Sequence, residues 1–131
     1  MTGAYAACTS RAIALARHYS GLGDPAVADT RLVERFDRVH TGEGFLRKAM
    51  VSSLTIQGLD ETAARYASYT DIAIVLRHRA ADPVRDLREL WSRMLFNILV
   101  GNTDDHARNH ACFWDGKTIR LSPAYDIDPR P

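Results

Sequence analysis

Apolar residues recur at helical spacing near the N-terminus of the chain. Gly21 and Gly23 follow this pattern and mark the point where a helix stops. We therefore predict an amphipathic first helix, then a strand from Thr30 to Phe36 and a turn from Thr41 to Gly44. The segment from Phe45 to Gly58 satisfies neither the helical nor the strand period cleanly, and we predict it to be partly helical. The apolar positions of the first helix are Tyr5, Cys8, Ala12, Leu15, Ala16 and Tyr19.

Stronger helical patterns occupy the middle of the chain. Ser68 is a good N-cap for a helix that runs to about His78. Asp82 and Pro83 form a cap and first-turn pair for a longer helix that ends near Gly101. The apolar positions are Tyr69, Ile72, Ala73 and Leu76 in the first of these helices, and Leu87, Leu90, Trp91, Met94, Leu95, Ile98 and Leu99 in the second. We expect both apolar stripes to face the core.

The last part of the chain predicts a β-hairpin. The runs from His110 to Trp114 and from Thr118 to Leu121 are typical of strands. They flank Asp115-Gly116, a dipeptide that favours the positive φ angles of a tight hairpin turn. Together with the helical patterns, this hairpin predicts an α+β fold that is mainly helical. No repeat, low-complexity segment or long linker divides the sequence, so we expect one domain over residues 1–131.

Composition places the chain among ordinary globular domains. Hydrophobic residues make up 46% of the sequence and charged residues 25%, which is close to average usage. The formal net charge is only +1 and no long basic run occurs, so we expect no direct binding to nucleic acid. Cys8 and Cys112 lie far apart, outside any metal-binding spacing, and we interpret them as reduced, buried thiols of a cytoplasmic protein. No apolar stretch is long enough to predict a membrane span, and we expect no membrane contact.

Candidate chemistry gathers between Val100 and Asp126. Asp104 and Asn109 are separated by the Asp-x-x-x-x-Asn interval of a kinase catalytic loop. In such a loop the Asp orients the attacking hydroxyl and the Asn holds Mg²⁺, for which carboxylate and amide oxygens are suitable ligands. The hairpin would bring Asp126 back beside the loop as a second metal ligand. Capping could explain an isolated Thr103-Asp104, but the interval, the hairpin and Asp126 together favour phosphoryl transfer.

Longer runs around these residues resemble a known family. The C-terminal lobe of HipA-like serine/threonine kinases, the toxin kinases of bacterial toxin-antitoxin modules, is similar to FNILVGNTDDHARNH and WDGKTIRLSPAYDIDP. LVERFDR, from Leu32 to Arg38, resembles the hinge strand of the same family. The resemblance implies a helix and hinge strand in residues 1–38 and the core of a kinase C-lobe in residues 39–131. At Asp105 and Arg108 the loop departs from many relatives, and we interpret these polar residues as variation rather than inactivation.

The resemblance also implies specific roles and ligands. It implies ATP and Mg²⁺ as cofactors, a protein substrate, and an antitoxin or a separately encoded N-lobe as partner. Asp104 would act as the catalytic carboxylate, with His106 reaching the phosphates. Adenine would be held through backbone groups near Glu34 and Phe36, with Tyr125 packed against it. The Gly-rich loop, the strand with the phosphate-binding Lys and the closing helices of the family are not found in this sequence, so we expect the isolated chain to be inactive.

Other functions stay open at this point. In one, the chain is a metal-dependent hydrolase in which His106 and His110 combine with Asp104 or Asp126. The sequence disfavours this hypothesis because it supplies neither an HExxH glutamate nor a third strong ligand. In the other, the chain is a non-catalytic remnant that folds or binds a partner without transferring phosphate.

Overall fold

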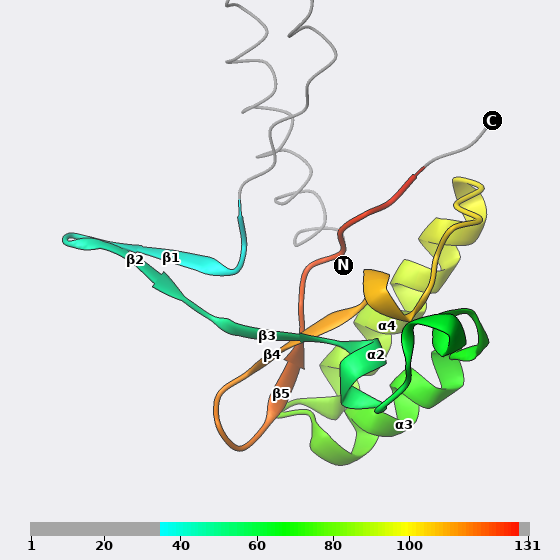
Figure 1. Ribbon diagram of the computed structural model, residues 1–131, viewed down its shortest axis with the longest axis horizontal. Helices are drawn as coiled ribbons and strands as arrows, with labels where there is room; N and C mark the ends of the chain where they lie inside the picture. The colour runs from blue at the N-terminus through cyan, green and yellow to red at the C-terminus, as the bar shows by residue number, and fades with distance from the viewer. Residues whose placement is uncertain (1–34, 129–131) are drawn as a thin grey trace, which may run out of the picture. The chain divides into compact units, whose positions relative to one another are not determined.

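The computed structural model describes residues 35–128 of the chain, and residues 36–128 belong to one compact unit. It contains helices and small antiparallel sheets, which confirms the predicted α+β class (Figure 1). The elements are β1 (Arg38–Thr41), β2 (Gly44–Arg47), β3 (Ala49–Ser52), α2 (Ser53–Ile56), the 3₁₀ helix η2 (Glu61–Tyr66), α3 (Tyr69–Arg79), α4 (Pro83–Leu99), the 3₁₀ helix η3 (Ala107–Asn109), β4 (Ala111–Trp114) and β5 (Ile119–Leu121). No helix within residues 35–128 is long and apolar enough to cross a membrane.

The strands form two separate antiparallel sheets. Strands β1 and β2 pair as a hairpin, and the turn predicted from Thr41 to Gly44 connects them as expected. In the three-stranded sheet, β4 lies between β3 and β5, with Val51 of β3 opposite Cys112 of β4. The predicted hairpin around Asp115-Gly116 is confirmed as the β4–β5 connection, where Gly116 adopts a φ of 100° that suits glycine.

The N-terminal predictions need correction where the structure describes them. The predicted first helix and most of the strand from Thr30 to Phe36 lie outside the described residues. Phe36 itself lies in a turn, because the pairing with β2 begins only at Arg38. The segment from Phe45 to Gly58 is partly helical as predicted, at α2, but half of its residues belong to β2 and β3. Its strands form because β3 pairs with a distant partner, β4, which no local period could indicate.

Capping residues start α3 and α4 where the sequence predicts. The Ser68 hydroxyl accepts a hydrogen bond from the Asp71 amide, and the Asp71 carboxylate accepts one from the Ser68 amide. This reciprocal pair is a capping box, which satisfies backbone donors that the first helical turn leaves free. At α4, the Asp82 carboxylate accepts from the Arg85 amide at 3.1 Å, and Pro83 occupies the first turn.

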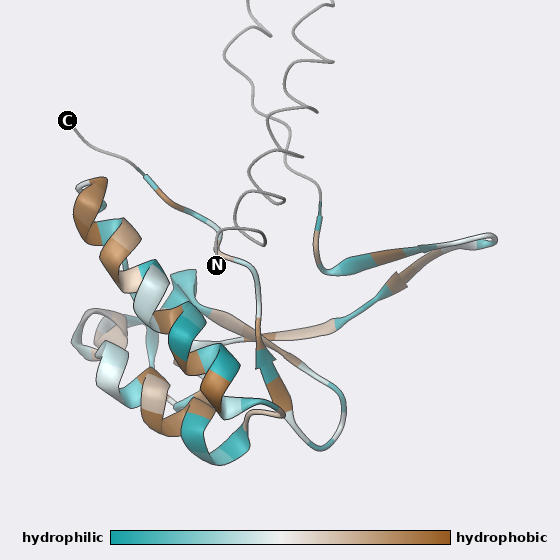
Figure 2. Cartoon of the chain, turned by 180° about the vertical axis from the view of Figure 1, so that it is seen from behind, coloured by the Kyte–Doolittle hydropathy of each residue, from teal (hydrophilic) through white to brown (hydrophobic). Residues whose placement is uncertain are grey.

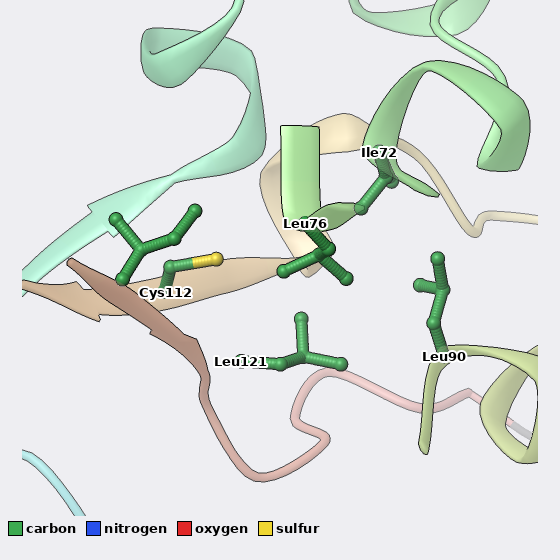
Figure 3. Packing of buried hydrophobic residues seen from close by; sticks show 6 residues of the cluster. Ile72, Leu76, Leu90, Cys112 and Leu121 are labelled. Carbon is green, nitrogen blue, oxygen red and sulfur yellow. The ribbon is translucent and has the colours of Figure 1, made fainter. Parts of the chain in front are cut away.

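The core lies between α3, α4 and the three-stranded sheet. Ile72 and Leu76 of α3 meet Leu90 of α4 and the inward side chains of β4 and β5 (Figure 3). The buried members are Ile72, Leu76, Leu90, Cys112, Ile119 and Leu121. Cys112 is a free, buried thiol as predicted, and burial raises its pKa to about 12; Cys8 lies outside the described residues.

The buried face of α4 is not the predicted one. Its buried residues are Asp86, Leu90, Arg93 and Asn97, whereas Trp91 is 59% exposed. The predicted stripe is therefore confirmed at Leu90, which is buried, and at Leu87, which packs against the core, but it is wrong at its exposed members Trp91, Leu95, Ile98 and Leu99. Polar side chains occupy the inner face because each bonds to a backbone or side-chain group of a neighbouring segment, and apolar residues remain on the outside of the last turns (Figure 2).

Candidate active site

Residues 101–110, which we call the candidate catalytic loop, leave the C-terminal end of α4 through a sharp turn. Gly101 has a φ of 67°, the left-handed conformation that commonly ends a helix. The Asn102 amide then donates to the Asn97 carbonyl at 2.9 Å, which ties the start of the loop to α4. Further on, Ala107 is buried with Leu54 of α2 and Ala64 of η2 in a small second core. The loop is thus fixed at its start and in its middle.

Asn109 contacts the backbone of Asp104 and of Asp126, the two acidic residues predicted from the sequence. Its Nδ2 donates to the Asp104 carbonyl at 3.0 Å and lies 3.5 Å from the Asp126 carbonyl. Asn109 is buried, while Asp104 and Asp126 are exposed. Because the amide nitrogen faces both carbonyls, the Oδ1 atom of Asn109 is the one that could contact a cation. The structure therefore brings Asp104, Asn109 and Asp126 together.

Asp126 adopts an unusual backbone conformation. It is the non-glycine residue with positive φ in the described part of the chain, at 55°. This left-handed conformation costs an ordinary L-residue roughly 1–2 kcal/mol, although Asp and Asn tolerate it better than most residues. Strain of this kind is concentrated at functional sites, where the surrounding structure holds it. Asp126 therefore stays a candidate functional residue.

The segment before Asp126 is held by the polar inner face of α4. The Asp86 carboxylate accepts from the Leu121 amide at 3.0 Å, and Arg93 Nη2 donates to the Ser122 carbonyl at 2.7 Å. Both side chains are almost fully buried, and burial raises the pKa of Asp86. Sequence reasoning missed these residues, although the spacing of Asp86, Arg93 and Asn97 with Leu90 follows one helical face.

Asp105 and His110 form a buried pair inside the loop. His110 Nε2 lies 2.9 Å from Asp105 Oδ1, and the Tyr69 hydroxyl donates to Asp105 Oδ2. Burial alone would raise the pKa of Asp105, but hydrogen bonds from His110 and Tyr69 hold it below the usual value. Burial and the bond to Asp105 raise the pKa of Tyr69. Asp105 therefore has a structural role in the loop, and its interpretation as variation rather than inactivation stays a prediction.

These contacts disfavour the hydrolase hypothesis. His110 directs Nε2 at Asp105, and Nδ1 of the same ring has no hydrogen-bond partner among the described residues. Within residues 35–128, no group of three or more His, Cys, Asp and Glu side chains is arranged to hold a metal ion.

His106 is only partly buried, and its Nδ1 is enclosed without a hydrogen-bond partner in the same part of the chain. Its carbonyl accepts from the Asn109 amide at 2.8 Å.

An aromatic cluster brings together two of the predicted adenine contacts. The ring centroids of Phe36 and Tyr125 are 5.9 Å apart, and those of Phe36 and Phe113 are 6.1 Å apart. The Lys48 ammonium lies 4.9 Å from the centre of the Phe113 ring. The Tyr125 hydroxyl donates to the Arg108 carbonyl of the loop, and burial raises the pKa of Tyr125. This cluster is therefore attached to the catalytic loop.

Phe113 and Lys48 were missed by sequence reasoning. Phe113 follows the core residue Cys112, and strand alternation places its side chain on the opposite face of β4. That alternation is a signal for Phe113 once the strand is assigned, but nothing local indicates Lys48. Glu34, the other predicted hinge residue, lies outside the described residues.

Comparison with known families agrees with this geometry. The family model for the HipA-like C-terminal domain matches residues 8–130, which is most of the chain. The chain belongs to this family. The match includes the candidate catalytic loop, the β4–β5 hairpin and Asp126, so it confirms the family resemblance seen in the sequence.

Individual relatives of this HipA-like chain are more distant. A protein of Sinorhizobium fredii (strain NBRC 101917 / NGR234) named "Putative kinase Y4mE" is 28% identical over 101 residues, covering 73% of this chain and 24% of that protein. A chain in the Shewanella oneidensis MR-1 complex of the toxin-antitoxin system HipA, HipB and its operator DNA has a TM-score of 0.67 and 24% identity, covering 72% of this chain and 26% of that one. The latter likeness shows the fold alone. The chain spans about a quarter of the length of each.

Proposed function

We propose that this HipA-like chain supplies the catalytic loop and metal-binding segment of an ATP- and Mg²⁺-dependent protein kinase. One observation carries the proposal: Nδ2 of Asn109 faces the carbonyls of both Asp104 and Asp126. A single buried side chain thereby holds the backbone of a candidate acceptor-orienting residue close to the backbone of a candidate metal ligand. Phosphoryl transfer depends mainly on such positioning and on neutralising charge.

Asp104 is suited to contact a protein substrate. It is exposed, and its backbone amide is held by the Asn102 side chain at 3.3 Å. An exposed carboxylate on a fixed backbone can accept a hydrogen bond from a substrate hydroxyl and orient it toward the transferring phosphate. Serine and threonine hydroxyls are the acceptors that fit this role, as the family resemblance also implies.

Asn109 and Asp126 are suited to hold Mg²⁺. Both offer hard oxygen atoms, and Mg²⁺ commonly binds through one or two such side chains together with water and substrate phosphates. When bound, the cation would neutralise charge on the phosphates of ATP. The position of Oδ1 in Asn109 and the left-handed backbone of Asp126 both fit this role.

The aromatic cluster is a candidate adenine contact. Phe36 and Tyr125 form a tilted pair with ring centroids 5.9 Å apart, and the Tyr125 hydroxyl bonds to the Arg108 carbonyl. Aromatic faces stack favourably on a purine ring, so this pair could bind adenine beside the catalytic loop. We keep His106, whose Nδ1 is enclosed without a hydrogen-bond partner among the described residues, as the candidate phosphate contact.

A toxin-antitoxin function is the biological setting that the relatives favour. The similar Shewanella oneidensis complex contains HipA, HipB and operator DNA. For the protein that contains this chain we propose an antitoxin partner of the HipB kind. Contact with DNA would then be made by the partner, in keeping with a net charge of only +1 on this chain.

The test is a titration with MgATP followed by NMR, which also detects weak binding. We expect MgATP to shift the side-chain amide signals of Asn109, and ATP with EDTA to shift them much less. Asp126→Asn should weaken this response at least tenfold, because Asn tolerates the left-handed backbone but removes the metal-binding charge. Glu43→Gln, an exposed acidic residue in the β1–β2 turn, is the matched control and should bind normally.

Phosphotransfer is then measured with the chain alone and mixed with a separately expressed N-lobe of a HipA-like relative. We expect little activity from the chain alone and activity on mixing. Asp104→Asn should lower turnover by a factor on the order of 10² with little change in ATP affinity. A chain whose Asn109 signals do not respond to MgATP in either setting would overturn the proposal and favour a non-catalytic partner-binding function.

A further inference from the structure

The catalytic loop is closed by a continuous series of hydrogen bonds that runs through α3 and α4. Asn102 Nδ2 donates to Asn97 Oδ1 at 3.2 Å, and Asn97 Nδ2 donates to the Tyr69 hydroxyl at 3.1 Å. That hydroxyl donates to Asp105 Oδ2. The other carboxylate oxygen of Asp105 lies 2.9 Å from Nε2 of His110. We call these residues the loop ring: Tyr69, Asn97, Asn102, Asp105 and His110.

The loop ring reaches both candidate functional positions of the loop. At its start, Asn102 Oδ1 accepts from the Asp104 amide at 3.3 Å. At its end, His110 directly follows Asn109 along the chain. The loop ring therefore has a member on each side of the segment from Asp104 to Asn109. Tyr69 on α3 and Asn97 on α4 attach it to the helices.

Two members of the loop ring, Asn97 and His110, are buried, and the other three are partly buried. Asn97 is 5% exposed and His110 is 2% exposed, and the Tyr69 ring packs edge-on against His110 with centroids 5.1 Å apart. A buried polar group that loses its partner carries an uncompensated desolvation cost, so each member constrains its neighbours. The pKa of Tyr69 is raised and that of Asp105 is lowered, so at neutral pH the phenol donates and the carboxylate accepts.

We infer that Tyr69 and Asp105 are positioning residues that hold Asp104 and Asn109 in the geometry needed for phosphoryl transfer. They do this from inside the domain, through the loop ring, and do not contact substrate. The inference rests on the proposed function for its catalytic consequence, whereas the hold on the loop can be measured without any activity.

The test uses Tyr69→Phe, which removes only the hydroxyl and keeps the ring that packs on His110. We expect hydrogen exchange at the Asn109 and Asn102 amides to become at least tenfold faster, because these amides close the loop onto His106 and Asn97. MgATP affinity at the Asn109 signals should fall several-fold. In a phosphotransfer assay, kcat should fall about tenfold while KM for the protein substrate changes little.

Ile72→Val is the matched control. It lies one turn further along α3 and loses core packing with no contribution to the loop ring. It should lower Tm by an amount similar to Tyr69→Phe, with unchanged exchange at the loop amides and unchanged MgATP affinity. Asp105→Asn is the second ring variant, which keeps the shape of the side chain while weakening its bond to His110. It should reproduce the effects of Tyr69→Phe.

The outcomes separate the two proposals. Unchanged loop exchange and MgATP affinity in both Tyr69→Phe and Asp105→Asn would overturn the inference, as would an equal effect of Ile72→Val. Faster loop exchange in the ring variants, with no MgATP response in the parent chain either alone or mixed with the N-lobe, would support the hold on the loop and overturn the proposed function.

Discussion

Asn109→Asp is the most informative substitution at the candidate site. It keeps the size of the side chain but replaces the donor Nδ2 by an oxygen. That oxygen would face the Asp104 carbonyl, to which Nδ2 now donates at 3.0 Å, and the Asp126 carbonyl, which is 3.5 Å from Nδ2. The substitution should therefore weaken the fold while improving the side chain as a metal ligand.

The expected magnitude follows from the hydrogen bonds and from burial. Losing the 3.0 Å bond costs about 1 kcal/mol, and leaving buried acceptors opposite one another costs about 1–3 kcal/mol more. Since Asn109 is 5% exposed, little water is available to compensate. We expect the free energy of unfolding to fall by about 2–4 kcal/mol in Asn109→Asp. Asn109→Ala should cost less, about 1–2 kcal/mol, because it adds no repulsion.

Urea unfolding with and without Mg²⁺ measures both effects. If the carboxylate introduced by Asn109→Asp shares a cation with Asp126, saturating Mg²⁺ at about a hundred times its Kd should restore about 2.7 kcal/mol to this variant and almost nothing to Asn109→Ala. Buffer with EDTA in place of Mg²⁺ is the control, because it measures the stability of each variant without a bound cation. If Asn109→Asp in EDTA were as stable as the wild type, the hydrogen bonds of Asn109 would be refuted. If Mg²⁺ did not restore the stability of this variant, that would count against the metal site.

Further predictions concern other parts of the domain. Asp86→Ala should lower the free energy of unfolding by about 1–3 kcal/mol because it leaves the Leu121 amide without its acceptor, whereas Asp86→Asn should cost less; equal losses in urea unfolding would contradict this. Burial raises the pKa of Asp86, so its carboxyl binds a proton more tightly in the folded state. Wild-type stability relative to Asp86→Asn should therefore be greatest below the ordinary pKa of 3.8 and decline as pH rises toward the folded value. Amides of Thr118 and Lys117 lower the pKa of Asp115 to about 2, so the stability difference between wild type and Asp115→Ala should vanish as pH falls from about 4 to 2 in thermal unfolding. In a Cys8→Ser background, Cys112 should resist a thiol reagent at pH 8 until the protein unfolds, since its pKa is about 12; rapid labelling of the native protein would contradict its burial.

Local chemistry allowed the sequence to predict several features by itself. The capping box at Ser68, the Asp82-Pro83 start of α4 and the Asp115-Gly116 turn all depend on groups within a few residues of one another. The Asp104 to Asn109 interval is equally local, and the family match agrees with the resemblance drawn from it. Such features can be read from sequence because the chain itself brings the interacting groups together.

Only the tertiary structure decided which partners the remaining residues find. The segment around Val51 is a strand because it pairs with Cys112 of β4, although its own sequence shows no clear strand period. The inner face of α4 is polar because Asp86 and Arg93 bond to the backbone after β5. Asp105 gains its role only when Tyr69 of α3 is brought beside it. Hydrogen bonds and packing between distant segments override local pattern, since burial makes an unpaired polar group costly and a paired one acceptable.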